Sequence, residues 1–398
     1  MGMHKILSCL NKHVHKKNII LFNSYPDISG NALALYEYII QYRPDILKKY
    51  RMIWTISEMS IKEAMDILHY RTGKRNHLIE YKKKLRGISL FLRAKYLVST
   101  HSYFPTINTP DSQIDINLWH GMTFKKIGRL LNTSHYNGVQ DKADISIATS
   151  FVFQGLISEA FGIPKSRVLV TGQPCNDFLY RSNKYLFRVM KNAHNYNKRI
   201  VWLPTYRTSI IGDIRQDGNA DSFGVVDVLQ NHFKEIDDCL KKENYLLIIK
   251  PHPMDAICSI QFRESDNIKL VYNSDLEKER IQLYEFLAGC DVLLTDYSSV
   301  FIDFLATGKP IAFICDDIAE YEKSRGFCFS SPRDYMPGEL IKNINQFIHY
   351  LKDMDEINNQ WKDKYKEIQT YFNPFCDRKS SERVCNELWG ESDGKKKC

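Results

Sequence analysis

Residues 291–308 read DVLLTDYSSVFIDFLATG, and residues 310–314 continue with PIAFI. The runs Asp291–Thr295 and Pro310–Ile314 are short and apolar without a clean alternation, which is typical of strands buried on both faces. The pattern between them, Val300–Thr307, predicts a helix. A strand, a helix and a second strand in this order predict a parallel sheet that helices cover on both sides.

The same alternation of short apolar runs and helical patterns extends outward through the whole chain. In the second half, further strands are expected at Arg199–Leu203, Tyr245–Lys250 and Lys269–Tyr272, with helices at Glu279–Ala288 and around Leu351–Tyr371. In the first half, helices are expected at Ala32–Tyr42 and Ser60–His69, and strands at Asn18–Asn23, Arg51–Ile56, Tyr96–Thr100, Asp115–Trp119, Ile145–Thr149 and Arg167–Thr171. Both halves therefore follow one α/β plan.

A polar stretch, Asn183–Lys198, separates the two halves, and a chain of 398 residues suits two domains of roughly 150 residues or more. We expect an N-terminal Rossmann-like domain at 1–185 and a C-terminal one at 198–373. A C-terminal helix and tail, 374–398, can pack back on the N-terminal domain. Open parallel sheets bind ligands beyond the carboxyl ends of their strands, so the loops after strands are the places to look for a site.

The composition excludes several classes of protein. The 55 Lys and Arg residues against 47 Asp and Glu leave a net charge of +8, which permits an anionic substrate or a membrane surface but indicates no nucleic-acid binding. No apolar run approaches the about 20 residues of a membrane helix, and the N-terminus lacks a secretory signal. The ten cysteines form no CxxC pair, so they indicate reduced thiols in a cytoplasmic protein and no metal site.

The first loop with unusual residues is Trp119-His120-Gly121, which Lys125 and Lys126 follow. A histidine at the end of a strand can act as a general base near neutral pH. Two lysines close behind it can attract a phosphate or an anionic acceptor. The alternative is a surface turn with two solvated lysines.

Two further loops each carry a cation. In Lys250-Pro251-His252-Pro253, the two prolines restrict the backbone on both sides of His252, whose protonated ring could neutralise a phosphate. In Pro204-Thr205-Tyr206-Arg207, the guanidinium of Arg207 could bind phosphate oxygens in a fork. The alternatives are a stiff turn with an incidental histidine and an arginine on the surface.

The loop Thr295–Ser299 brings hydroxyl groups to the start of a helix. There, Ser298 and Ser299 lie beside unpaired backbone N–H groups at the positive end of the helix dipole, which is a ready site for a phosphate. The alternative is ordinary N-capping by either serine. Cations and hydroxyls in one half and a base in the other suit a transferase with an anionic diphosphate donor, because such a reaction needs positioning and charge neutralisation.

In order and spacing, these motifs resemble those of the CDP-glycerol glycerophosphotransferases, enzymes that prime or extend teichoic-acid-like polymers. The resemblance covers most of the chain. It rests on Asn23-Ser24-Tyr25 with Asn31-Ala32-Leu33, Trp119-His120-Gly121 with Lys125-Lys126-Ile127-Gly128, Thr171-Gly172 through Asn176-Asp177, Pro204–Arg207, His252-Pro253, and Thr295–Ser299 with Lys309-Pro310 and Arg325-Gly326-Phe327.

This resemblance implies a GT-B fold, in which two Rossmann-like domains face a central cleft. It also implies transfer of a polyol phosphate from CDP-glycerol or CDP-ribitol with release of CMP, without a cofactor. His120 would be the base on the acceptor hydroxyl, with Lys125 and Lys126 on the acceptor side in the N-terminal domain. The C-terminal domain would bind the donor phosphates through His252, Ser298, Ser299, Arg207 and Lys250, supported by Thr295, Asp296 and Arg325.

Several points stay open at this stage. Met122, Cys175 and Thr208 depart from the family's usual residues, and they leave the acceptor and the polyol undetermined. The alternative enzyme is a capsule sialyltransferase of GT-B fold that uses CMP-sialic acid. The basic and then apolar segment Lys82–Arg93 suggests peripheral contact with the anionic inner face of the cell membrane, and the alternative is an amphipathic helix packed on the first domain.

Overall fold

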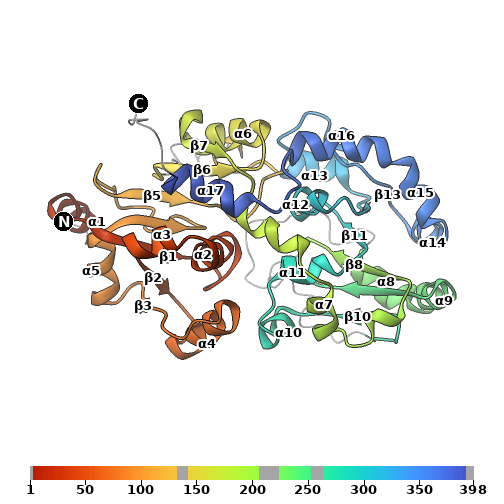
Figure 1. The fold of residues 1–398 in the computed structure, drawn as a ribbon. Coiled ribbons are helices and arrows are strands. Elements are labelled where there is room, and N and C mark those ends of the chain that lie inside the picture. Colours follow the sequence, from red (N-terminus) through yellow and green to blue (C-terminus); the bar gives the residue numbers. More distant parts are fainter. Residues whose placement is uncertain (1–2, 132–141, 206–223, 252–262, 391–398) are drawn as a thin grey trace. The chain divides into compact units, whose positions relative to one another are not determined.

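The computed structural model describes residues 3–131, 142–205, 224–251 and 263–390 (Figure 1). By its contacts the chain divides into two compact units. The N-terminal unit comprises Met1–Met122, Thr133–Phe178 and Asp377–Cys398, and the C-terminal unit comprises Thr123–Asn132 and Leu179–Cys376. Each unit has its own parallel sheet and its own core.

The N-terminal unit is built on a seven-stranded sheet of order β3-β2-β1-β4-β5-β6-β7, in which all neighbours pair in parallel. Its strands are β1 (Lys17–Asn23), β2 (Arg51–Ile56), β3 (Ile79–Tyr81), β4 (Ala94–Ser99), β5 (Ile114–Asn117), β6 (Ile145–Ala148) and β7 (Val168–Val170). Its helices are α1 (Met3–His13), α2 (Gly30–Tyr42), α3 (Pro44–Lys49), α4 (Ile61–Thr72), α5 (Leu85–Arg93), α6 (Phe151–Phe161) and α17 (Ser380–Trp389).

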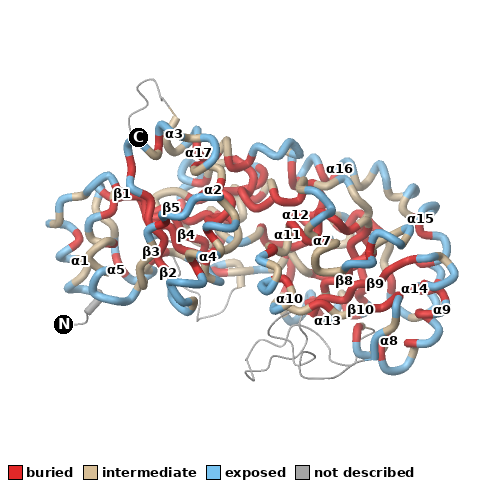
Figure 2. The backbone as a smooth tube through the Cα atoms, turned by 60° about the horizontal axis from the view of Figure 1, so that its bottom comes forward, coloured by how far each residue is buried: buried red, intermediate tan, exposed pale blue. Residues whose placement is uncertain are grey.

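Strand β1 shows why these apolar runs carry no alternation. Ile20 and Phe22 enter one core, which also holds side chains of α2, α4 and α17, whereas Ile19 and Leu21 enter a second core with Phe91 of α5. Because successive side chains of a strand point to opposite faces, both faces of the sheet must be covered. Strands β1, β2 and β4 are accordingly buried along most of their length (Figure 2).

The C-terminal unit is built on a six-stranded parallel sheet of order β10-β9-β8-β11-β12-β13. Its strands are β8 (Lys198–Leu203), β9 (Tyr245–Ile249), β10 (Ile268–Leu270), β11 (Val292–Thr295), β12 (Ile311–Ile314) and β13 (Leu340–Ile341). Its helices are α7 (Lys184–Val189), α8 (Val225–Asn231), α9 (Phe233–Glu243), α10 (Asn273–Lys278), α11 (Leu283–Ala288), α12 (Val300–Phe304), α13 (Ile318–Ser324), α14 (Ile344–Lys352), α15 (Met354–Gln360) and α16 (Lys362–Phe372). The expected α/β fold with two parallel sheets is confirmed.

The short segment Thr123–Asn132 belongs to the C-terminal unit, although the range 1–185 was expected to form one domain. Phe124 is fully buried there, with its ring 5.1–5.6 Å from the rings of Phe301, Phe327 and Phe329. Lys125 forms an antiparallel bridge with Phe327. Burial of an aromatic side chain and backbone pairing therefore hold this segment in the C-terminal core.

One other feature differs from the expectation. The long helix expected around Leu351–Tyr371 is broken, since α14 ends at Lys352, α15 covers Met354–Gln360 and α16 begins at Lys362. None of the helices in the described part of the chain is long and apolar enough to cross a membrane.

Candidate active site

The turn Trp119–Gly121 follows β5 at the carboxyl edge of the N-terminal sheet. Trp119 has a φ of 55° and Gly121 a φ of 145°, so the backbone takes a positive φ on both sides of His120. A non-glycine residue in the left-handed region costs about 1–3 kcal/mol and persists only where its surroundings hold it. Asn117 contributes to this by accepting the N–H of Trp119 through its side-chain oxygen at 3.0 Å.

The main support of this turn is Asn31, a fully buried residue in the first turn of α2. Its Nδ2 donates to the carbonyl oxygens of Leu118 and Trp119, both at 2.9 Å, and its Oδ1 accepts the N–H of Cys175 at 2.9 Å. In the sequence, Asn31 stood out only as part of a motif of the family resemblance, without a role of its own. The structure shows that one amide joins the start of α2 to the loops after β5 and β7.

His120 is held in one orientation. Its Nδ1 lies 3.2 Å from the carbonyl oxygen of Thr100, and its ring stacks on that of His101 with centroids 4.0 Å apart and planes 5° apart. Because a carbonyl oxygen can only accept, Nδ1 carries the hydrogen and Nε2 keeps its lone pair. The neutral ring is therefore prepared to accept a proton at Nε2.

Both stacked histidines are neutral at pH 7. Partial desolvation by the surrounding protein lowers the pKa of His120, although the residue is exposed to solvent, and the bond to Thr100 acts in the opposite direction. The pKa of His101 is lowered to about 4 by burial, by His120 and by Lys82. A neutral imidazole with a lowered pKa can act as a base without first losing a proton to solvent.

We expect the acid limb of the kcat/KM profile against pH to lie below pH 6.5, the ordinary pKa of histidine. The lowered pKa keeps His120 unprotonated as the pH falls through that value, so activity is lost only at lower pH. The measurement is kcat/KM for the acceptor at saturating donor from acidic to neutral pH. An acid limb above pH 6.5 would contradict the assignment of His120 as the base.

In the C-terminal unit, Asp296 joins the carboxyl ends of β8 and β11. It is 3% exposed, and its Oδ2 accepts the N–H of Thr205 at 2.9 Å and the hydroxyl of Thr205 at 2.6 Å. Its Oδ1 accepts the N–H of Ser298 at 3.2 Å. The neighbouring Thr295 donates its hydroxyl to the carbonyl oxygen of Leu203 at 2.7 Å, so it also ties β11 to β8.

Ser298 and Ser299 are half-buried at the start of α12. Ser299 is the N-cap residue, but its side chain makes no capping hydrogen bond. Among the residues that the structure describes, neither hydroxyl has a hydrogen-bond partner. Capping alone therefore does not account for the two serines. With respect to the described residues, both hydroxyls are available to a ligand.

The other expected site residues lie at different places in the C-terminal unit. Lys250, which follows β9, is 6% exposed and donates from Nζ to Asn273 Oδ1 at 2.5 Å. Arg325 is half-buried directly after α13. Lys125 places Nζ 5.3 Å from the centre of the Tyr321 ring in the same unit, and the N–H of Lys126 donates to Gly326. The N-terminal location expected for these two lysines thus differs from the observed one.

Two expected site residues, His252 and Arg207, lie outside the described residues. Within residues 3–131, 142–205, 224–251 and 263–390, no group of three or more His, Cys, Asp or Glu side chains is arranged to hold a metal ion.

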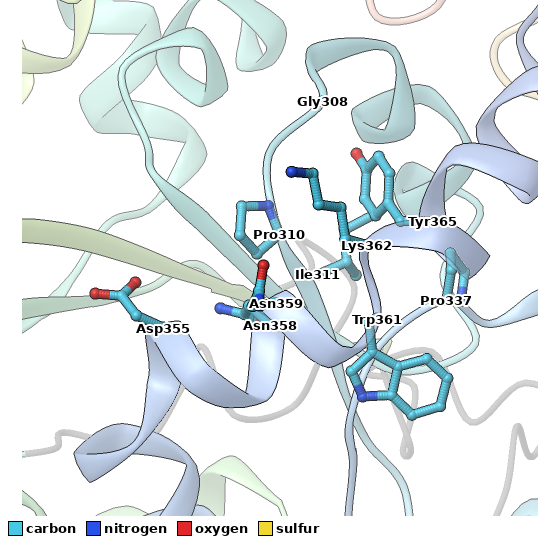
Figure 3. A pocket seen from close by; sticks show the side chains of 10 residues that line it. All are labelled: Gly308, Pro310, Ile311, Pro337, Asp355, Asn358, Asn359, Trp361, Lys362 and Tyr365. Atoms are coloured by element: carbon cyan, nitrogen blue, oxygen red, sulfur yellow. The ribbon is translucent and has the colours of Figure 1, made fainter.

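A pocket of about 360 Å³ in the C-terminal unit lies apart from these residues (Figure 3). Asn358 of α15, Tyr365 of α16 and Trp361 between these two helices line it together with Gly308 and Ile311. Ile311 is the first residue of β12, so the pocket lies at the amino end of that strand. Since parallel sheets bind substrates at the opposite ends of their strands, we do not assign the substrate to it.

The comparison with known proteins decides the family. The sequence model of the family CDP-Glycerol:Poly(glycerophosphate) glycerophosphotransferase matches residues 6–390. This chain belongs to that family. The expected resemblance is therefore confirmed, and the family favours a phosphotransferase over the alternative sialyltransferase.

Two sequence relatives and one solved structure illustrate what this glycerophosphotransferase-family enzyme is similar to. The teichoic acid ribitol-phosphate primase of Bacillus spizizenii is 24% identical and aligns over 96% of this chain and 93% of its own. The teichoic acid poly(glycerol phosphate) polymerase of the same species is 26% identical over 94% of this chain and 92% of its own. The solved structure of the wall teichoic acid polymerase TagF has a TM-score of 0.74 at 20% identity and covers 97% of this chain and 92% of that chain. This likeness confirms the GT-B fold.

Sequence reasoning missed His101, whose ring stacks on His120, and Lys82, which acts on His101. His101 directly follows the expected strand Tyr96–Thr100, so the rule that led to His120 could also have found it. Lys82 was read as part of a basic surface segment, because no sequence pattern shows that one lysine in a run of three turns inward. The structure brings both toward the carboxyl edge of the N-terminal sheet.

Proposed function

We propose that this enzyme transfers glycerol phosphate or ribitol phosphate from a CDP-polyol to a hydroxyl of a lipid-linked or polymeric cell-surface glycan. CMP is released, and the product belongs to teichoic-acid or capsule-type polymer synthesis. One observation carries this proposal. In a chain of the glycerophosphotransferase family, the hydrogen bond from His120 Nδ1 to the carbonyl oxygen of Thr100 leaves Nε2 of His120 unprotonated. The names of the similar primase and polymerase support both polyols.

The reaction follows from these groups. Nε2 of His120 accepts the proton of the acceptor hydroxyl as its oxygen attacks the phosphorus that carries the polyol. The bond between this phosphorus and the bridging oxygen of the diphosphate breaks, and its electron pair leaves on CMP. Negative charge grows on the phosphoryl oxygens and the leaving group, so cations and hydroxyl donors that are already in place lower the barrier.

The donor diphosphate is assigned to the carboxyl edge of the C-terminal sheet. Ser298 and Ser299 offer two hydroxyls without partners among the described residues, and Lys250 offers a positive charge at the end of β9. His252 and Arg207 join them on the strength of the family resemblance. A matched structure of TagF was obtained after a soak with CDPG, which supports the choice of donor.

Replacing Ser298→Ala together with Ser299→Ala should weaken donor binding about tenfold, because hydrogen bonds to a charged group are each worth about 1.5–3 kcal/mol and solvent recovers part of that loss. The measurement is the Kd of CDP-glycerol from calorimetry. The control is the exposed pair Ser330→Ala with Ser331→Ala, which should leave the Kd unchanged. Equal donor affinity in both double variants would remove the serines from the donor site.

Release of CMP tests the function itself. The purified protein is offered CDP-glycerol, CDP-ribitol and CMP-sialic acid in parallel, each with and without a lipid-linked acceptor. Acceptor-dependent CMP from one CDP-polyol is expected and names the polyol. CMP from the sialyl donor alone, or from none of the three, would overturn the proposal.

We further propose that the N-terminal unit contacts the anionic face of the membrane through α1 and α5, which pack against each other. Ile6 and Leu10 of α1 are 45% and 47% exposed, and Leu85 of α5 is 89% exposed. Exposed Lys83, Lys84 and Arg86 surround Leu85, whereas the apolar half of α5 turns inward, with Phe91 in the core. The expected contact is thus confined to the first turn of α5 and to α1.

Vesicle sedimentation tests this contact. Vesicles rich in phosphatidylglycerol should bind the protein, and purely zwitterionic vesicles should bind it much less, because basic residues at an anionic surface are worth about 1 kcal/mol each. Leu85→Glu should lower binding severalfold, while Leu78→Glu, a change at an exposed leucine before β3, should have a smaller effect. Equal binding of both variants would place the membrane contact elsewhere.

A further inference from the structure

The side chain of Lys82 turns inward, unlike those of its exposed neighbours Lys83 and Lys84. Its N–H donates to the carbonyl oxygen of Ile56 at 2.9 Å, which continues the pairing of β3 with β2 and fixes the backbone. Its Nζ donates to Asn23 Oδ1 at 2.8 Å, at the end of β1. The amine therefore lies at the carboxyl edge of the sheet.

The surroundings of this amine are built to hold it. Asn23 is 6% exposed, and its Nδ2 donates to the carbonyl oxygen of Thr55 at 2.8 Å, which fixes Oδ1 toward Lys82. Nζ also lies 4.7 Å from the centre of the Tyr103 ring and 5.3 Å from that of Phe104. Aromatic faces attract an ammonium group but do not neutralise its charge.

No carboxylate of the described residues forms an ion pair with Lys82. Asp115 of β5 and Asp27 of the loop after β1 act on it only as more distant charges, and Lys83 opposes them. Asp27 is already used, since it accepts the N–H groups of Ser57, Glu58 and Met59. A half-buried ammonium without a counter-charge is unfavourable, and an anionic ligand would remove that cost.

His101 is a neighbour of both this amine and the proposed base, His120. Its ring stacks on His120 at 4.0 Å, and Lys82 is close enough to lower its pKa. The exposed ring of Tyr25 lies 5.8 Å from the ring of His101, in an edge-on arrangement. A cation, two neutral imidazoles and an exposed aromatic ring thus lie after the carboxyl ends of β1, β3, β4 and β5.

We propose that Lys82, with Asn23 and His101, forms a subsite for a phosphate group of the acceptor. This inference rests on the proposed function, in which His120 deprotonates the acceptor hydroxyl. In an acceptor that already ends in a polyol phosphate, the reacting hydroxyl and a phosphate belong to the same terminal unit, so the phosphate lies close to the hydroxyl. The subsite therefore selects acceptors to which at least one polyol phosphate has been added.

The protonation of Lys82 makes the subsite sensitive to alkaline pH. Burial is the main cause that lowers its pKa to about 8, while Lys83 lowers it further and Asp115 and Asp27 raise it. The amine is mostly cationic at neutral pH and loses its charge as the pH rises through that value. His101 and His120 are neutral over the same range, so they add no charge of their own.

The first test measures binding without turnover. The probe is glycerophosphoglycerol, a phosphodiester with two terminal glycerols, and the titration is followed calorimetrically at neutral pH. Lys82→Met should bind it at least about tenfold more weakly than the wild type, as expected when a charged hydrogen bond is lost. Lys83→Met removes the same charge from the neighbouring exposed position and should leave the affinity unchanged. Equal affinity in the wild type and Lys82→Met would overturn the subsite.

Lys82→Arg separates charge from structure. Its guanidinium stays cationic at pH values where the amine of lysine is neutral. At about pH 9.5, binding of the probe to the wild type should fall about tenfold, whereas Lys82→Arg should keep its own neutral-pH affinity. A parallel fall in both proteins would show that the charge of Lys82 does not bind the phosphate. Thermal unfolding of each variant confirms that it is folded.

Kinetics distinguish the acceptor's phosphate from that of the donor. With an acceptor primed by a polyol phosphate, Lys82→Met should raise the acceptor KM about tenfold and leave the KM of the CDP-polyol unchanged. The same glycan without the polyol phosphate should show equal KM values in both proteins. A rise in the donor KM instead would overturn the proposal. If the wild type releases no CMP from any CDP-polyol, the proposed function fails, and the binding experiment still decides the subsite.

Discussion

His120→Asn should lower the rate of transfer by about a thousandfold or more while the enzyme still binds its donor. General base catalysis contributes roughly 10²–10⁴-fold, and asparagine of similar size keeps a group near Thr100 without a basic nitrogen. The measurement combines kcat for acceptor-dependent CMP release with the Kd of the CDP-polyol. Only the rate should change.

A matched control exists in the same unit. His69 also places Nδ1 near a backbone carbonyl oxygen, that of Lys74 at 3.1 Å, but it lies on the exposed face of α4. His69→Asn should therefore leave the rate within about twofold of the wild type. Loss of donor affinity in His120→Asn, with the rate per bound donor unchanged, would disprove the role of His120 as the base.

Asp296→Asn should weaken donor binding by more than about tenfold and lower the free energy of unfolding by about 3 kcal/mol. The amide keeps the size of the carboxylate, but its nitrogen cannot accept. It must therefore lose either the two bonds from Thr205 or the bond from Ser298. Either loss releases a loop that carries proposed donor ligands. Calorimetry with CDP-glycerol and urea unfolding measure the two effects.

Asp291 provides the control because it lies just before β11, at the opposite edge of the same sheet. It accepts the N–H of Arg199 at 2.7 Å and pairs with the guanidinium of that residue. Asp291→Asn should also destabilise the unit, yet it should leave the donor Kd unchanged. Similar losses of donor affinity in both variants would mean that Asp296 acts through stability alone.

The sequence allowed the central strands to be predicted, because a strand buried on both faces needs a continuous apolar run. The edge strands β3 and β13 are only three and two residues long, and such short runs carry no recognisable period. The position of Phe124 could not be predicted for a different reason. An apolar residue shows that a segment is buried, but its local pattern does not show which of two cores receives it.

Local patterns place the candidate residues after strands, but they do not show which way a side chain points. His120, Ser298 and Ser299 follow strands, and the position of a strand end can be read from apolar patterning. The inward turn of Lys82 depends on Asn23 and on the rings of Tyr103 and Phe104, which come from other segments. No local pattern contains these partners.

Segment Thr123–Asn132 belongs to the C-terminal unit, and segment Asp377–Cys398 belongs to the N-terminal unit. This arrangement sets the order in which the two units can fold during synthesis. Val384 and Cys385 of α17 belong to the core of the N-terminal unit, beside residues of α2. That core is complete only after almost the whole chain has emerged, whereas Phe372, which closes the C-terminal unit, emerges earlier. We therefore expect the unit made first to be finished last: a purified chain that ends at residue 376 should contain a folded C-terminal unit beside an N-terminal unit that proteases still cut.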